Sequence, residues 1–251
     1  MKILRFLTLL LITGCVAPLP IPPEFTSKTI ETPDFDFAVM QKITQPHKPY
    51  KIYIEGDGYA FNAYGEPTTD PTPHGTLVRQ IAFEDSHPNV VYMARACQFV
   101  QHKLCTQKYW TTARFAPEII TAQADAIKQI AGDNAVTLVG FSGGAQIAGL
   151  IAVTHPEIKV QKIITIAGNL DHPAWTQHHR VPPLSESADL NDYREELAQI
   201  EQTHYVGTED TIMPPFLNEN FVNDAHRIVV VKGADHNSGW DSVIPEIRNA
   251  D

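Results

Sequence analysis

The chain has 251 residues, 43% of them hydrophobic, and a formal net charge of −10. This length suits one large α/β domain with a substantial core, and no second domain is evident. The acidic balance argues against nucleic acid as a partner and against electrostatic attachment to anionic lipid.

The first 14 residues have the pattern of an export signal. Lys2 and Arg5 form a basic start, and the apolar run from Ile3 to Ile12 is too short to span a bilayer. We therefore predict that residues 1–14 are a signal peptide and not part of the fold.

Cys15 ends the run Ile-Thr-Gly-Cys, which resembles a bacterial lipobox, whose cysteine is lipidated and becomes the first residue. Several acyl chains, palmitate among them, would anchor the chain stably. Val16 follows in place of an aspartate, which favours the outer membrane of the bacterial cell envelope, with the domain facing the periplasm. The alternative is an ordinary secretory signal with a chance cysteine.

The two remaining cysteines, Cys97 and Cys105, lie close together in one predicted loop. An exported chain meets an oxidising compartment, in which such a pair forms a disulfide. We predict that bond; the alternative is two free thiols.

After a proline-rich tether over residues 15–24, the chain alternates short apolar runs with helical patterns. The predicted strands are 25–30, 35–43, 50–54, 90–94, 136–140, 162–167, 203–207 and 228–231. The predicted helices are 74–83, 117–131, one after Ser142, 190–200, 215–223 and 239–248. This alternation predicts one α/β domain over 25–251 with a mostly parallel central sheet and helices on both faces. Residues 168–201 break the rhythm, and we interpret them as a small cap or lid.

The stretch from Val136 to Ala145 is the most informative in the chain. It joins an apolar, β-branched run to Gly-x-Ser-x-Gly and then to a helix with a small, apolar face. Strand, sharp turn and helix form the context of a nucleophile elbow, with Ser142 at its tip. The glycines on either side let strand and helix approach closely.

A serine hydroxyl needs a base to take its proton and an acid to orient that base. Asp210 follows a predicted strand, and His236 lies in a Gly-x-x-His loop directly after the last strand. The order Ser, Asp, His predicts a catalytic triad. Asp210 could instead cap the following helix, and Glu209 or Asp171 could be the acid.

Charge on a developing oxyanion requires backbone donors set in advance. One candidate is the amide of Gly143, which follows the nucleophile. The second should come from Gly56-Asp57-Gly58, after the strand at 50–54, where lipases and esterases place a glycine-rich motif. The sequence leaves open whether Asp57 or Gly58 is that donor.

These motifs identify a resemblance to the α/β-hydrolase superfamily that covers essentially residues 25–251. Its nucleophile, acid and histidine motifs match Gly140 to Gly144, Gly207 to Pro214 and Gly233 to His236. The stretches 53–58, 94–98 and 109–111 are similar to a group of bacterial lipoprotein or periplasmic members of unassigned substrate. The resemblance implies hydrolysis of an ester, thioester or amide through an acyl-enzyme. One departure is Glu-Gly-Asp-Gly where many lipases have His-Gly-Gly-Gly, and a carboxylate there would disfavour anionic substrates.

We therefore expect a membrane-anchored serine hydrolase, most simply a carboxylesterase, acting on a small ester or acyl substrate without a cofactor. The alternatives are a serine peptidase or acyltransferase with the same triad, and an inactive hydrolase fold that serves as an envelope binding module. No metal site is expected, because no acid or cysteine completes the histidine cluster at 172, 178 and 179. The candidate pocket residues are Tyr59, Phe61, Phe141, Trp175, Met213 and Trp240.

Overall fold

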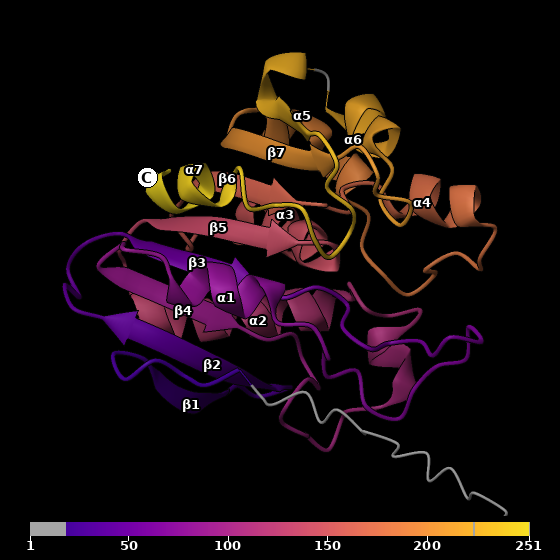
Figure 1. Cartoon of the computed structure of the whole chain (residues 1–251). Helices are drawn as coiled ribbons and strands as arrows, with labels where there is room; N and C mark the ends of the chain where they lie inside the picture. Colours follow the sequence, from indigo (N-terminus) through magenta and orange to yellow (C-terminus); the bar gives the residue numbers. More distant parts are fainter. Residues whose placement is uncertain (1–18, 223, 251) are drawn as a thin grey trace, which may run out of the picture.

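The computed structural model describes residues 19–222 and 224–250, which form an eight-stranded sheet with helices on both faces (Figure 1). The strand order is β1-β2-β4-β3-β5-β6-β7-β8. The first two strands pair antiparallel, β2 pairs antiparallel with β4, and the other neighbours are parallel. The mostly parallel α/β sheet predicted from the sequence is thus confirmed.

The strands lie close to their predicted positions, because each is a short apolar run between turn residues. Their bounds are β1 Thr26–Glu31, β2 Asp36–Ile43, β3 Tyr50–Ile54, β4 Asn89–Met93, β5 Val136–Phe141, β6 Val160–Ile166, β7 Glu201–Gly207 and β8 Ile228–Val231. Every residue of the three central strands β3, β4 and β5 is buried. That burial fits strands covered by helices on both faces.

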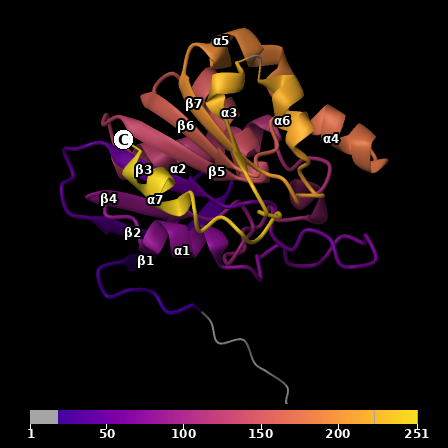
Figure 2. The ribbon, with the colours of Figure 1, turned by 45° about the horizontal axis from the view of Figure 1, so that its top comes forward.

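The helices divide between the two faces of the sheet (Figure 2). The α-helices are α1 Leu77–Phe83, α2 Pro117–Ala131, α3 Gly143–Thr154, α4 His172–His179, α5 Arg194–Ala198, α6 Pro215–Phe221 and α7 Ile244–Asn249. Three 3-10 helices lie at η1 Gln107–Trp110, η2 Leu190–Tyr193 and η3 Ala225–Arg227. Apolar side chains of α2 and α3 form one core, and those of α1 and α7 form a second core on the opposite face.

Two helices begin later than predicted. The first was expected from His74, but α1 begins at Leu77, because the ring of His74 stacks on Tyr59 at 4.3 Å outside the helix. The last was expected from Gly239, which has φ +82° and so cannot continue a right-handed helix. Its helix, α7, begins at Ile244, where a proline occupies the first turn.

The segment 168–201, predicted as a cap with a single helix, contains the additional helix α4. Its first turn is capped by Asp171, whose Oδ1 accepts a hydrogen bond of 2.9 Å from the amide of Ala174. Farther along, Leu190 is fully buried against Gly149 of α3. Helix α4 lies beyond the carboxyl ends of the strands (Figure 1). A lid function for this segment stays a prediction.

Cys97 and Cys105 form the predicted disulfide, with their Cα atoms 5.6 Å apart. The predicted signal peptide, Cys15 and the first part of the tether lie outside the described residues. Within the described ranges, no helix is both long enough and apolar enough to cross a bilayer.

Candidate active site

Ser142 stands on a sharp turn between β5 and α3, with φ 50° and ψ −120°. A residue with a side chain rarely adopts this left-handed conformation, so the turn is strained. A Cβ at Gly140 would lie 2.6 Å from the backbone of Ala145, and one at Gly144 would lie 2.5 Å from the carbonyl of Ile54. Both positions therefore require glycine, as expected for an elbow.

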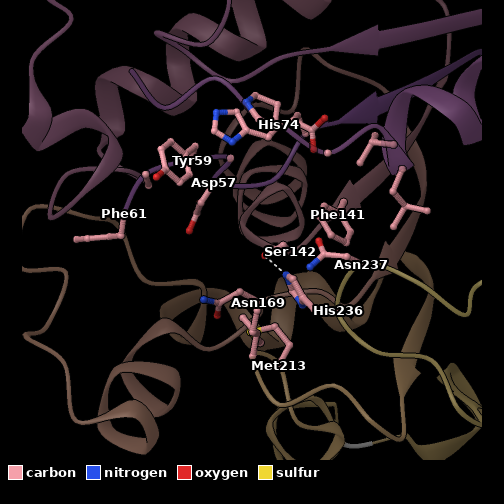
Figure 3. A pocket seen from close by; sticks show the side chains of 18 of the residues that line it. Asp57, Tyr59, Phe61, His74, Phe141, Ser142, Asn169, Met213, His236 and Asn237 are labelled. Atoms are coloured by element: carbon pink, nitrogen blue, oxygen red, sulfur yellow. Dashed lines mark hydrogen bonds between the residues drawn. The ribbon is translucent and has the colours of Figure 1, made fainter. Parts of the chain in front are cut away.

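Ser142, His236 and Asp210 form one chain of hydrogen bonds. The Nε2 atom of His236 lies 3.1 Å from the Oγ of Ser142 (Figure 3). Its Nδ1 lies 2.9 Å from the Oδ2 of Asp210. The three residues follow β5, β8 and β7, so the carboxyl ends of parallel strands bring them together from distant parts of the sequence.

The second carboxylate oxygen of Asp210 also accepts hydrogen bonds. Its Oδ1 accepts hydrogen bonds from the amides of Ile212, at 2.9 Å, and Met213, at 2.7 Å. The carboxylate thus orders the loop and faces the histidine at the same time. The other two candidate acids make no such contact: Asp171 caps α4, and Glu209 is exposed.

The predicted oxyanion donors lie in α3 and in the loop after β3. Gly143 is the first residue of α3, so its amide has no partner four residues earlier within the helix. Gly56 lies against the serine, since a Cβ there would come within 3.2 Å of the Ser142 Cβ. Gly58, with φ +66°, packs in the other direction, because a Cβ there would come within 2.1 Å of the Pro71 carbonyl. Asp57 lies between these two glycines and above Ser142 (Figure 3).

The carboxylate of Asp57 bridges two arginines. Its Oδ1 lies 2.9 Å from Nη1 of Arg95, and its Oδ2 lies 2.5 Å from Nη1 of Arg114. Burial raises the pKa of Asp57, but the two guanidiniums outweigh burial and hold that pKa below its ordinary value. The sequence predicted that this carboxylate disfavours anionic substrates. The two arginines paired with it oppose that effect, because their positive charges offset its negative charge.

Glu55, one residue before the loop glycine, is buried beneath the site. Its carboxylate accepts hydrogen bonds from the hydroxyl of Tyr92 at 2.9 Å and from the amide of Gly56 at 3.0 Å. Burial raises the pKa of Glu55 above its ordinary value. The hydrogen bond from the Gly56 amide to the Glu55 carboxylate fixes the start of the loop that follows β3.

A cavity of about 520 Å³ opens above Ser142 and His236. This volume lies within the range that takes a small organic molecule. Five of the six candidate pocket residues line it: Tyr59, Phe61, Phe141, Trp175 and Met213. The sixth, Trp240, is buried in the core at 1% exposure, which is the commoner place for an aromatic side chain, and it does not line the pocket.

Sequence reasoning did not assign Asn237, which lines the cavity next to His236, to the site, and it missed three further polar residues. His74, Arg114 and Asn169 also line this cavity. Asn169 follows β6 at the carboxyl edge of the sheet, and that position was an available signal. Arg114 lies in an irregular loop with no pattern around it, so nothing in the sequence singled it out.

The histidine cluster near α4 is not arranged around a common point. His172 is buried and stacks on Phe115, while His178 packs against His179 and Phe216. Across residues 19–222 and 224–250, no three His, Cys, Asp or Glu side chains come together in a way that could hold a metal ion.

Comparison of the sequence with protein-family models and with curated proteins finds no match. Comparison of the structure does find similar folds. A serine hydrolase without a lid from Xanthomonas campestris is 14% identical with a TM-score of 0.53, and the match covers 93% of this chain and 94% of that one. An esterase from Pyrococcus furiosus is 15% identical with a TM-score of 0.57, covering 90% of this chain and 87% of that one.

A thioesterase domain of the curacin biosynthetic pathway is also similar, at 15% identity and a TM-score of 0.58, with 89% of this chain and 97% of that one covered. Sheet order, elbow and structural neighbours agree, so the chain has the α/β-hydrolase fold. Identities this low establish the fold, and the activity has to be argued from the site.

Proposed function

We propose that this protein is a serine hydrolase that cleaves carboxylic esters through an acyl-enzyme on Ser142. The observation that supports this most directly is the hydrogen-bonded chain Ser142–His236–Asp210 at the floor of an open cavity. Each member has the geometry that its role needs, with base and nucleophile within hydrogen-bond reach.

In this mechanism the Oγ of Ser142 attacks the ester carbonyl while Nε2 of His236 takes its proton. Asp210 orients the ring and stabilises the imidazolium that forms. The backbone amide of Gly143 and that of Asp57 or Gly58 stabilise the developing oxyanion, since both loop residues line the cavity. His236 then protonates the leaving alcohol, and water releases the acyl group by the same steps in reverse.

The N-terminal motif suggests where this reaction takes place. We infer that Cys15 is lipidated and that the domain is held in the bacterial cell envelope, at the periplasmic face of the outer membrane. The lipobox-like run ending at Cys15 supports this assignment. The Cys97–Cys105 disulfide agrees with an oxidising compartment.

Labelling with a fluorophosphonate tests the proposed chemistry, because such a probe reacts with an activated serine. The wild-type protein should be labelled and should hydrolyse 4-nitrophenyl butyrate. Ser142→Ala should lose both the label and the hydrolysis. Ser238→Ala is the matched control and should keep both, since Ser238 is exposed and bonds only to Asp235. Failure of the wild type to react with either reagent would contradict the proposal.

A further inference from the structure

Five charged side chains lie in the wall of the cavity and next to it. Glu55, Asp57 and Arg114 line the cavity, and Arg79 and Arg95 lie outside its lining. Asp57 is paired with both Arg95 and Arg114, so one carboxylate faces two guanidiniums. Glu55 lies next to this group and is influenced by the charges of Arg79 and Arg95. The five side chains together have a formal charge of +1, inside a protein whose net charge is −10. Buried charge without a full complement of counter-ions is costly, and an anionic ligand relieves that cost.

Arg114 presents this excess charge to the cavity. Arg95 cannot, because it is enclosed: its Nη2 donates to the Arg114 carbonyl, and its guanidinium lies over the ring of Phe115. Arg114 itself lines the cavity, and its side chain is 6% exposed.

The hydrogen bonds of Arg114 leave one nitrogen available. Its Nε donates to the Thr111 carbonyl at 2.9 Å, and its Nη1 bonds to Asp57. Among the described residues, nothing accepts a hydrogen bond from its Nη2. The rings of Phe61 and Trp175, both in the cavity wall, lie 5.5 Å and 5.8 Å from the guanidinium. They hold the group in a fixed position.

Asn169 is a second polar group without a partner. It is 4% exposed, it lines the cavity, and its labelled side chain lies beside Ser142 (Figure 3). In the part of the chain that the structure describes, its Oδ1 is buried without a hydrogen bond. A buried amide left unpaired costs free energy, so this residue is also best satisfied by a bound molecule.

We propose that Arg114 determines specificity by binding a carboxylate of the substrate, with the side-chain Nδ2 of Asn169 as a second hydrogen-bond donor. The preferred substrates are then esters that carry an acid group, rather than simple alkyl esters. This inference rests on the proposed function, because it names the substrate class of the same site. A guanidinium suits this task, since it stays charged and matches the planar geometry of a carboxylate.

Two matched pairs of esters test the proposal. In the first pair, 4-nitrophenyl hexanoate and the monoanion of 4-nitrophenyl adipate share chain length and leaving group, and differ in a carboxylate on the acyl side. In the second pair, 4-(butyryloxy)phenylacetate and its methyl ester differ in a carboxylate on the alcohol side. Measurement at 0.15 M salt limits repulsion by the rest of the acidic protein, because the screening length is then about 8 Å.

In the wild type, the anionic member of at least one pair should have a kcat/KM at least about 10-fold higher, as expected for a hydrogen bond to a charged group. Arg114→Gln should reduce this preference to about one or below, and Arg114→Lys should retain part of it. Asn169→Asp, which adds a negative charge at nearly constant shape, should also reduce the preference, and it tests the idea independently if Arg114→Gln does not fold. Arg180→Gln, an exposed arginine at the end of α4, is the control for net charge and should leave the preference unchanged.

Equal or lower kcat/KM for the anionic member of both pairs in the wild type would overturn the proposal. So would an Arg114→Gln variant that loses activity by the same factor on both members of the preferred pair, since Arg114 would then only position Asp57. A fluorophosphonate label on Ser142 distinguishes these results from failure of the proposed function. Without that label and without hydrolysis of any of the four esters, the proposed function fails, and the specificity fails with it.

Discussion

The carboxylate of Asp210 takes part in three hydrogen bonds, which have two different consequences. Two of them tie its Oδ1 to the amides of Ile212 and Met213, so the loop after β7 keeps its shape. The third places its Oδ2 against Nδ1 of His236 and selects the tautomer in which Nε2 accepts a proton. Sequence reasoning weighed a capping role against a catalytic one, and the geometry allows both at once.

Asp210→Asn should therefore lower kcat by about 10⁴-fold, because an amide can stabilise the wrong tautomer of His236. Ser142→Ala and His236→Ala should each remove nearly all activity. The double variant should lower kcat little further than either single variant, since the three triad residues act as a unit.

Asp171→Asn and Glu209→Gln are the controls for this series, and both should keep substantial turnover. Asp171 faces the start of α4, and Glu209 faces solvent. If Asp171→Asn were as damaging as His236→Ala while Asp210→Asn stayed active, the assignment of the acid would be wrong.

The site residues that could be predicted from the sequence are those that directly follow a predicted β-strand. Ser142, Asp210 and His236 each follow a β-strand, and the rule that ligands bind at the carboxyl ends of parallel strands brings them together. The partners of Asp57 could not be found this way. Arg95 does follow β4 by two residues, but nothing local indicates that it reaches Asp57. Arg114 comes from a loop whose path depends on tertiary packing, and no local pattern records it.

Strand β7 carries a buried histidine, His204, which lies opposite Thr165 of the neighbouring strand β6. Nδ1 of His204 lies 2.9 Å from the Thr165 hydroxyl, and its Nε2 lies 3.1 Å from Oε1 of Gln202. Burial, with a smaller effect of Arg227, lowers the pKa of His204 from 6.5 to about 3. The folded protein thus keeps this ring neutral where the unfolded chain would protonate it.

This difference predicts a pH-dependent stability. The contribution of His204 is fully present above pH 6.5, the unfolded value, and is lost progressively as the pH falls from 6.5 towards 3. Between pH 7.5 and 5.5 it should lower the free energy of unfolding by about 1 kcal/mol. Urea denaturation at both pH values measures this, and His204→Gln should lose that part of the change. His226→Gln, at an exposed position, should keep it.

The Cys97–Cys105 disulfide should stabilise the loop after β4. Closing so short a loop removes about 2–3 kcal/mol of chain entropy from the unfolded state on the loop-closure model. The double variant Cys97→Ala/Cys105→Ala should be less stable by at least that amount, since Cys97 is also fully buried. Dithiothreitol should lower the stability of the wild type and leave the variant unchanged. A wild type that is insensitive to the reductant would contradict this prediction.

The sequence predicted which strands and helices form more accurately than it predicted the residues at which they begin and end. Strand positions agreed because apolar runs between turn residues are unambiguous at this spacing. Helix α4 was missed although Asp171 and Pro173 form a cap and a first turn, because its face has few apolar positions. The starts of α1 and α7 depend on where His74 stacks and on the backbone of Gly239, which are tertiary features.

For the whole molecule, the central prediction concerns attachment to the membrane. If Cys15 is lipidated, Cys15→Ser should release the protein from the membrane fraction or leave its signal peptide uncleaved. Fractionation of cells followed by mass spectrometry of the N-terminus measures both outcomes. Unchanged membrane association of the variant would show that another part of the chain is the anchor.

The contact between Asp57 and Gly143 has an evolutionary consequence. A Cβ at position 143 would lie 2.1 Å from the Oδ1 of Asp57, so the carboxylate occupies the volume that any larger residue would need. The two positions can therefore not drift independently. A lineage that replaces Gly143 must first shorten the side chain at 57, and it then leaves two arginines without their shared counter-ion. Substitutions at 57, 95, 114 and 143 should be inherited together, as one linked unit, among descendants of this chain.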